Sequence, residues 1–184
     1  ATAHTDHPCF HIKPFPEMKE HGYLKINTEV YGGPILNTWL DRPVSVSGKV
    51  CIKSDSVMNP TTILFDAQVP LLTIPNLAIH INREINKGVE LNRQTDISPI
   101  IGMMNETLNE NNFFMEYLAK ELQVDAADIL DFDLNVYCLE EPTTIGMNEE
   151  FFSSPRLDNL TSVVLGDSVT TIGYYAFSSC SGLT

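Results

Sequence analysis

Alternation of apolar and polar side chains dominates the first third of the chain and most restricts its fold. Period two places successive side chains on opposite faces of a strand, so that one face can enter a core while the other meets solvent. The first third is therefore predicted to be rich in β-strands. The segments that show this pattern are Cys9–Lys13, Tyr23–Val30, Val44–Lys53 and, after the turn-forming residues 58–60, Ile63–Val69.

Apolar residues then recur at helical spacing. A helix is predicted at Asn76–Asn86, because Pro75 suits the first turn of a helix and Gly88 suits its end. His80 lies near the apolar face that Leu77 would form on this helix. The pattern alone leaves two alternatives for His80, a core or interface side chain and a functional group.

The second half of the chain predicts two more helices and one more strand. An apolar stripe predicts a helix at Asn112–Gln123, and Asp125 is a typical N-cap for a short helix at Ala126–Leu130. Residues Phe132–Leu139 return to period two, as a strand would. The expected fold class is α+β, with sheet segments on both sides of a helical middle.

Composition excludes two classes of partner. The chain has 24 Asp and Glu against 11 Lys and Arg, a formal net charge of −13, and it has no basic run of the kind that binds phosphates. Its most apolar stretch, Val69–Ile81, contains two prolines and is shorter than the about 20 residues that a membrane span needs. Neither nucleic acid nor a membrane is expected as a partner. Four cysteines without a C-x-x-C pair favour reduced thiols and a cytoplasmic location.

Two short motifs carry metal-binding residue types. His4 and Asp6 form an H-x-D triplet, and on an extended strand their side chains leave the same face. Imidazole binds zinc, and a carboxylate that accepts a hydrogen bond from its other ring nitrogen raises its basicity. Asp158 lies in the loop-like segment 154–159, where a carboxylate can bridge two cations. Both motifs are also compatible with polar surface residues, and an isolated H-x-D triplet is more often a polar strand end than a metal site.

The last residues differ from the rest of the chain. DNLT at 158–161 is repeated as SGLT at 181–184, a spacing of 23 residues that lies within the range of leucine-rich repeats. The segment SVTTIGYYAFSSCSGLT resembles the repeats of large bacterial surface leucine-rich proteins. Residues 161–184 are therefore interpreted as a leucine-rich-repeat-like tail.

A longer resemblance covers residues 1 to about 160. Four blocks occur in the same order as motifs of the aspartyl aminopeptidase family, whose members are co-catalytic zinc exopeptidases. Because the blocks are separate and contain unusual strings, the resemblance is far more specific than the H-x-D triplet alone. The blocks are AHTDHPCFHIKP, TEVYGGPILNTWLDRPVSVSGKV, PNLAIHINREIN and FSSPRLDNL.

The resemblance implies an α/β catalytic domain that binds two zinc ions and is interrupted by a β-rich inserted domain. That inserted domain dimerises and helps to build a larger homo-oligomer. Residues 16–148 would be the inserted dimerisation domain, while residues 1–15 and 149–160 would be partial strands of the catalytic domain. An inserted domain leaves and re-enters its host at neighbouring points, so that the two flanking segments are expected to meet.

The resemblance also implies roles for four residues. His4 would bind one zinc ion, Asp158 would bridge both ions, and Asp6 would be the catalytic-site carboxylate that orients His4. His80 would reach into the active site of a neighbouring subunit and help to hold the substrate carbonyl. The implied reaction is the release of N-terminal residues from peptides, acidic residues among the candidates, by zinc-activated water and a general-base Glu.

The sequence departs from the family pattern after Leu160. The general-base Glu and the further zinc ligands of the family do not follow there, so the isolated chain is expected to be inactive as a peptidase. The alternative function is a non-catalytic oligomerisation or scaffold module fused to a leucine-rich repeat. Assembly without zinc is expected of the scaffold, and zinc at His4 and Asp158 is expected of the enzyme.

Overall fold

The computed structural model describes residues 7–104 and 111–155. The predicted site residues His4, Asp6 and Asp158 and the predicted tail 161–184 lie outside these ranges. Cys9–Leu139 form one compact unit, and the described residues 7–8 and 140–155 belong to a second. Among the described residues, no helix is long and apolar enough to cross a membrane.

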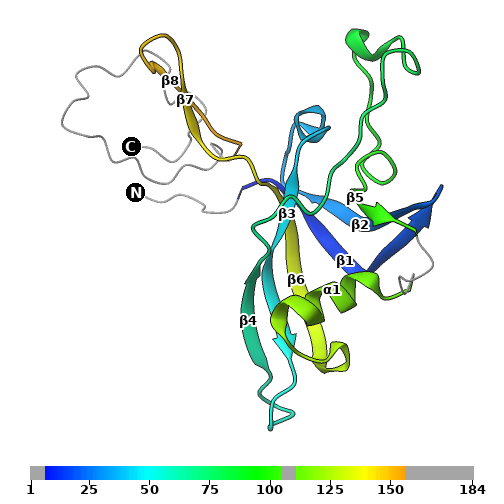
Figure 1. Cartoon of the computed structure of the whole chain (residues 1–184), viewed down its shortest axis with the longest axis vertical. Helices are drawn as coiled ribbons and strands as arrows, with labels where there is room; N and C mark the ends of the chain where they lie inside the picture. Colours follow the sequence, from blue (N-terminus) through cyan, green and yellow to red (C-terminus); the bar gives the residue numbers. More distant parts are fainter. Residues whose placement is uncertain (1–6, 105–110, 156–184) are drawn as a thin grey trace. The chain divides into compact units, whose positions relative to one another are not determined.

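The larger unit is built on one sheet of six strands, and every neighbouring pair in it is antiparallel. The order across the sheet is β4-β3-β6-β1-β2-β5 (Figure 1). The last long strand of the sequence therefore lies between two strands from its beginning. The strands are β1 (Cys9–Glu20), β2 (Tyr23–Tyr31), β3 (Val44–Ile52), β4 (Thr61–Asp66), β5 (Ile100–Met103) and β6 (Ile129–Cys138).

Each strand predicted from period two is present, although the bounds differ. β1 is longer than predicted and continues past an irregularity between Ile12 and Glu17, where Phe15 has a φ of 55°. β5 was not predicted, because four residues of the composition IIGM show no alternation. Its strand character comes from pairing with β2, an interaction between residues far apart in sequence.

The helix predicted at Asn112–Gln123 is confirmed as α1 (Phe113–Leu122), which packs against the sheet through an apolar face. Phe114 and Leu118 are fully buried there. The ring of Phe114 meets that of Phe132 on β6 edge to face, with centroids 6.0 Å apart. Aromatic pairs of this geometry add to the stabilisation that burial itself provides.

Asp125 caps a short helix as predicted, because its side chain accepts a hydrogen bond from the backbone N–H of Ala127 at 2.9 Å. The helix is a single 3-10 turn, η3 (Ala126–Asp128). It does not reach Leu130 as predicted, because β6 begins at Ile129 and pairs with β3. Sheet pairing therefore overrides the helical propensity of these residues.

The core lies on one face of the sheet and beneath α1. Phe10, Val136 and Val46 face one another across the central strands β1, β6 and β3, and all three are fully buried. The ring of Trp39, in the 3-10 helix η1 (Leu36–Trp39), lies 4.4 Å from that of Phe10, centroid to centroid. Burying a large apolar side chain contributes about 1.5–3 kcal/mol, so this face supplies much of the free energy of folding.

The helix predicted at Asn76–Asn86 is wrong. The segment forms turns and one short 3-10 helix, η2 (Ile85–Lys87). Leu77 and Ile81, the side chains that suggested a helical face, are 56% and 74% exposed, so they are not packed against the part of the chain that the structure describes. A short helix without a packed face is marginal in water, and here the side chain of Asn76 instead accepts the N–H of Leu77 at 2.8 Å.

The described part of the smaller unit contains a hairpin of two short strands, β7 (Thr143–Ile145) and β8 (Phe151–Ser153). Their residues are exposed. In the turn between them, the carboxylate of Glu150 accepts hydrogen bonds from the backbone and side-chain N–H groups of Asn148 at 3.1 and 2.9 Å. A hydrogen bond from its own backbone N–H, together with these two from Asn148, lowers the pKa of Glu150.

Gly48 is required where β3 pairs with β6. Its φ is 150°, and a Cβ atom there would collide with the carbonyl oxygen of Asp133 and lie 2.9 Å from the Cα of Leu134. The contacted atoms are backbone atoms of a central strand, so they cannot move aside without breaking the ladder. The close approach of these two strands therefore depends on glycine.

We expect Gly48→Ala to lower the free energy of unfolding by about 3 kcal/mol, because the added methyl group forces the central strands apart. Gly33→Ala is the matched control, since a Cβ atom at Gly33 meets nothing within 4 Å. Urea denaturation of the two variants measures the difference. Equal stability of the two variants would contradict the close backbone approach.

Candidate functional site

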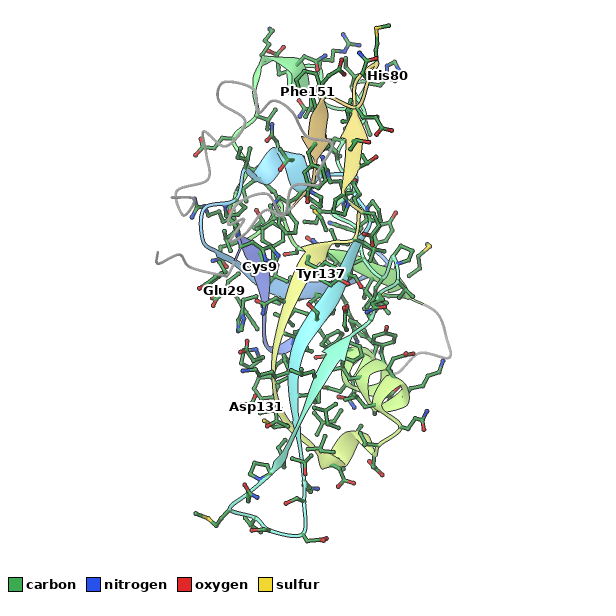
Figure 2. All side chains as sticks on the ribbon, turned by 90° about the vertical axis from the view of Figure 1, so that its left-hand side faces the viewer. Cys9, Glu29, His80, Asp131, Tyr137 and Phe151 are labelled. Carbon is green, nitrogen blue, oxygen red and sulfur yellow. The ribbon has the colours of Figure 1, made fainter. Side chains whose placement is uncertain are left out.

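Of the four predicted site residues, His80 is the one that the structure describes. It lies in the long connection between β4 and β5, within a turn, and its side chain is exposed. Figure 2 shows it away from the six-stranded sheet, at the far end of that connection. His80 makes no hydrogen bond or ion pair to the residues that the structure describes, so both ring nitrogens are available to another molecule.

The loop that carries His80 leaves the sheet and returns to it at one point. The backbone N–H of Thr73 donates to the carbonyl of Ile100 at 3.1 Å, and the N–H of Ile100 donates to the carbonyl of Thr73 at 2.8 Å. Residues 74–99 are therefore an excursion whose two ends are tied together. We refer to these residues as the His80 loop.

Asp41 fastens the outgoing end of the His80 loop. Its backbone N–H donates to the carbonyl of Ile74, and its carboxylate Oδ1 accepts the N–H of Asn76, both at 2.8 Å. Asp41 has a φ of 59°, in the left-handed region that Asp and Asn tolerate better than most residues. One residue thus fixes both the path and the hydrogen bonding of the loop where it starts.

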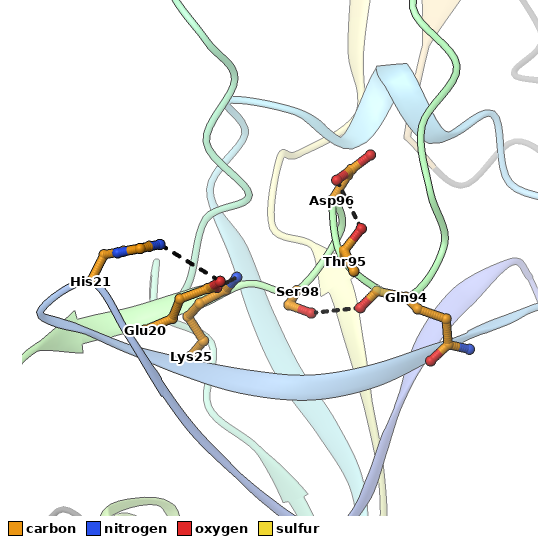
Figure 3. Close-up of polar contacts among 7 residues, drawn as sticks. All are labelled: Glu20, His21, Lys25, Gln94, Thr95, Asp96 and Ser98. Carbon is orange, nitrogen blue, oxygen red and sulfur yellow. Dashed lines mark hydrogen bonds and ion pairs between the residues drawn. The ribbon is translucent and has the colours of Figure 1, made fainter.

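Asp96 organises the returning end. Its Oδ2 accepts the N–H of Asn92 at 2.8 Å, and its own N–H donates to the carbonyl of Asn92 at 3.0 Å. The hydroxyl of Thr95 donates to Asp96 Oδ1 at 3.0 Å, and that of Ser98 donates to the carbonyl of Gln94 at 3.3 Å (dashed lines in Figure 3). The returning chain is therefore closed by local hydrogen bonds directly before it rejoins the sheet.

The middle of the loop combines a polar group with exposed apolar side chains. Ile79 and Ile81, the two neighbours of His80 in sequence, are 50% and 74% exposed. The turn is closed by the carbonyl of Ala78, which accepts the N–H groups of Ile81 and Asn82 at 2.8 and 3.0 Å. An imidazole flanked by exposed apolar residues is suited to a surface that another protein covers.

An ion pair lies at the turn between β1 and β2. Lys25 Nζ is 2.7 Å from Glu20 Oε2, and His21 Nε2 is 4.0 Å from Glu20 Oε1 (Figure 3). The hydrogen bond and the charge of Lys25, with a smaller contribution from His21, lower the pKa of Glu20. This pair links the two strands of the β1–β2 hairpin, and β5 pairs with the β2 side of that hairpin.

The described residues contain no group of three or more His, Cys, Asp or Glu side chains placed to hold a metal ion. The predicted zinc ligands His4 and Asp158, and the carboxylate of Asp6, lie outside the described ranges. The meeting of His4 with Asp158 therefore stays a prediction.

Sequence reasoning missed the residues that shape the His80 loop. Asp96 makes local bonds of the kind that Asp and Asn form in turns, and the run Asn92–Asp96 is rich in such residues. That signal predicts turns but does not identify the partner segment. The bond from Asp41 to Asn76 joins residues that only the folded chain brings together.

Comparison with known proteins identifies the family. Residues 1–169 match the family model described as Aminopeptidase I zinc metalloprotease (M18). The chain belongs to the M18 family. It is 53% identical over 162 residues to the probable M18 family aminopeptidase 2 of Clostridium novyi (strain NT), covering 88% of this chain and 37% of that protein. It is 49% identical over 164 residues to the probable M18 family aminopeptidase 2 of Clostridium acetobutylicum, a match that covers 89% of this chain and 38% of that protein.

Solved structures share the fold. A chain in the cryo-EM structure of the Ape4 and Nbr1 complex has a TM-score of 0.74 at 31% identity, covering 82% of this chain and 31% of that one. The M18 aminopeptidase from Thermotoga maritima has a TM-score of 0.63 at 22% identity, covering 82% and 34%. The S. cerevisiae mApe1 dodecamer has a TM-score of 0.62 at 21% identity, and the match covers 82% of this chain and 33% of that one. This M18 chain thus spans less than two fifths of the length of the relatives named here.

We expect Asp41→Ala to loosen the outgoing end of the His80 loop, because the variant loses the carboxylate that holds Asn76 and places Ala in a left-handed conformation. Hydrogen exchange at the Asn76 amide should become about tenfold faster. Asp41→Asn is the matched control, since Asn offers a side-chain oxygen and tolerates this φ. Equal exchange in the Ala and Asn variants would show that the side chain does not anchor the loop.

We expect Glu20→Gln to destabilise the chain at neutral pH and to have little effect in acid. The pKa of Glu20 is lowered from 4.5 in the folded chain, so the ion pair stabilises the fold above pH 4.5, and this contribution is lost as pH falls through the folded-state pKa. The urea denaturation midpoints of the unchanged chain and of Glu20→Gln, determined over a range of pH, measure this contribution of the ion pair to stability. Glu90→Gln, which changes an exposed carboxylate, controls for the loss of one charge. A pH-independent difference would refute the assignment.

Proposed function

We propose that this chain is part of a zinc aminopeptidase that releases N-terminal residues from peptides, acidic residues among the candidates. The observation that carries the proposal is the family match over residues 1–169, together with 53% identity to a probable aminopeptidase across 88% of the chain. Because the chain spans 37% of that relative, the proposal concerns the residues that it contributes to a site. By themselves the 184 residues are expected to be inactive.

Two zinc ions are proposed for the complete site, with His4 binding one ion and Asp158 bridging both. Asp6 would hold the imidazole of His4 in position, as carboxylates commonly do for histidine ligands. Bound zinc would lower the pKa of a water molecule and polarise the substrate carbonyl. The H-x-D spacing and the family's description as a zinc metalloprotease support this assignment.

His80 is proposed to bind the substrate carbonyl in the active site of a neighbouring subunit. An imidazole N–H can donate a hydrogen bond to a carbonyl oxygen on which negative charge develops. Three features of the His80 loop support the role: its ends are fastened to the sheet, its middle is exposed, and His80 has no partner among the described residues. Fastened ends limit the positions of the imidazole while the loop extends toward another subunit.

Self-association into a dimer and a larger homo-oligomer follows from this role. The exposed Leu77, Ile79 and Ile81 around His80 provide apolar surface for such a contact. A solved structure with the same fold is a dodecamer. We assign residues 16–148 to an inserted dimerisation domain and residues 1–15 and 149–160 to catalytic-domain strands. The compact unit Cys9–Leu139 supports this division.

We also propose a cytoplasmic location, with a peptide substrate and neither nucleic acid nor membrane as a partner. Cys9, Cys51 and Cys138, the cysteines among the described residues, are not in disulfide bonds, as is usual in a reducing compartment. The net charge of −13 supports the absence of a nucleic-acid partner.

The alternative is a non-catalytic oligomerisation module fused to a leucine-rich repeat. One sequence observation favours it, the recurrence of DNLT as SGLT after 23 residues. The two functions differ in metal binding. A scaffold would assemble without zinc, whereas residues of a peptidase site would bind zinc once the remaining ligands are present.

A graft tests the enzyme directly. Residues 1–160 replace the aligned segment of the Clostridium novyi relative, and zinc content and release of an N-terminal Asp or Leu reporter are measured. We expect the graft to hold zinc and to turn over. In the graft, His80→Ala should retain zinc and lower kcat about a hundredfold, because it removes one donor to the developing oxyanion.

The controls separate the assigned roles. His4→Ala should lose zinc as well as turnover, whereas His21→Ala, which changes an exposed histidine on the β1–β2 turn, should change neither. A folded oligomeric graft without zinc would support the scaffold alternative. Full activity in His80→Ala would refute the role of His80 and leave the metal assignment intact.

A further inference from the structure

A groove of about 430 Å³ lies between β5 and residues 70–73. Its walls include Pro70, Leu71, Ile101 and Met103, and none of its lining residues is charged. Met103 is 68% exposed and Tyr23, on β2, is 41% exposed. All residues that line the groove belong to the larger unit. The groove lies beside β5, which is the edge strand of the sheet (Figure 1).

The hydrogen-bond register determines which backbone groups of β5 face this groove. Met104 N–H donates to the carbonyl of Gly22 at 2.9 Å, and Tyr23 is paired with Met103. In an antiparallel ladder, hydrogen-bonded and non-hydrogen-bonded pairs alternate. Met103 is therefore in a non-hydrogen-bonded pair with β2, and its N–H and C=O point away from β2, toward the groove.

Ile100 faces the same way, and its two groups are already bonded to Thr73. The pairing does not continue from Thr73 toward Pro70, for a local reason. Pro70 has no N–H, while the N–H groups of Leu71 and Leu72 both donate to the carbonyl of Val44, at 3.1 and 3.0 Å. Residues 70–72 are thus committed to β3, and the space beside Met103 is left as the groove.

We infer that β5 is a docking edge for an extended, uncharged, apolar peptide segment of a partner protein. The segment adds as a strand beside β5 by bonding to the N–H and C=O of Met103, and its apolar side chains enter the groove. Outward backbone groups on an edge strand favour an extended chain over a helix, and uncharged apolar walls favour apolar side chains. This inference does not depend on the proposed peptidase activity.

The test uses the full 184-residue chain and a fluorescein-labelled probe, acetyl-Thr-Val-Thr-Ile-Thr-Val-amide. Fluorescence anisotropy measures binding, and the ¹⁵N shift of the Met103 amide reports where the probe binds. Met103→Pro removes the outward donor without removing a β2–β5 hydrogen bond, so we expect about tenfold weaker binding. Met103→Leu retains the donor and an apolar side chain and should bind like the unchanged chain.

A second measurement does not require a variant to fold. The same probe with N-methyl groups on alternate amides keeps its side chains but loses strand hydrogen bonds, and it should bind the unchanged chain about tenfold more weakly. Equal binding of both probes would overturn strand addition. The absence of any binding of the unmethylated probe would also overturn the inference. So would self-association of the chain that Met103→Pro abolishes, because it would identify a second copy of the chain as the occupant of the edge.

Discussion

The insertion of β6 between β1 and β3 is the constraint on which the rest of the structure depends. β6 pairs with β3 along nearly its whole length and with β1 through Phe10 and His11, so that the sheet is complete only when the last long strand has joined. On the opposite face of the sheet from Phe10, Asn135 Oδ1 lies 3.3 Å from His11 Nδ1 and accepts a hydrogen bond from the buried thiol of Cys9 at 3.4 Å. Closing so long a loop costs conformational entropy, which the buried face of Phe10, Val46 and Val136 offsets.

The same closure determines where the chain enters and leaves the compact unit of this M18 segment. β1 and β6 lie side by side, so the unit Cys9–Leu139 starts and ends on neighbouring strands. An inserted domain needs that arrangement, because its host must continue where it was interrupted. The same sheet supports the His80 loop, whose ends meet at Thr73 and Ile100. A rigid base with an exposed, anchored loop is a suitable way to present one imidazole to another subunit.

The strands and α1 could be predicted because their signals are local. Period two in β2 and the apolar stripe of α1 each predict which side chains are buried, and the observed burial follows that pattern. The helix predicted around His80 failed because apolar spacing indicates a face without showing that a surface exists to cover it. Ile81 is an example, since its side chain remains 74% exposed. For the candidate site, the sequence identified His80 but neither Asp41 nor Asp96.

The sequence by itself determined the family, the α+β class, the strand-rich start and the capping of η3 by Asp125, because each depends on residue order or on neighbours within a few positions. The tertiary structure alone decided the strand order, the existence of β5 and the tied ends of the His80 loop. Those features depend on hydrogen bonds between backbones far apart in sequence, such as Thr73 with Ile100. The identity of a residue does not specify its backbone hydrogen-bond partner, because nearly every residue carries the same backbone N–H donor and C=O acceptor. The packing of the core determines which of these donors and acceptors are brought together.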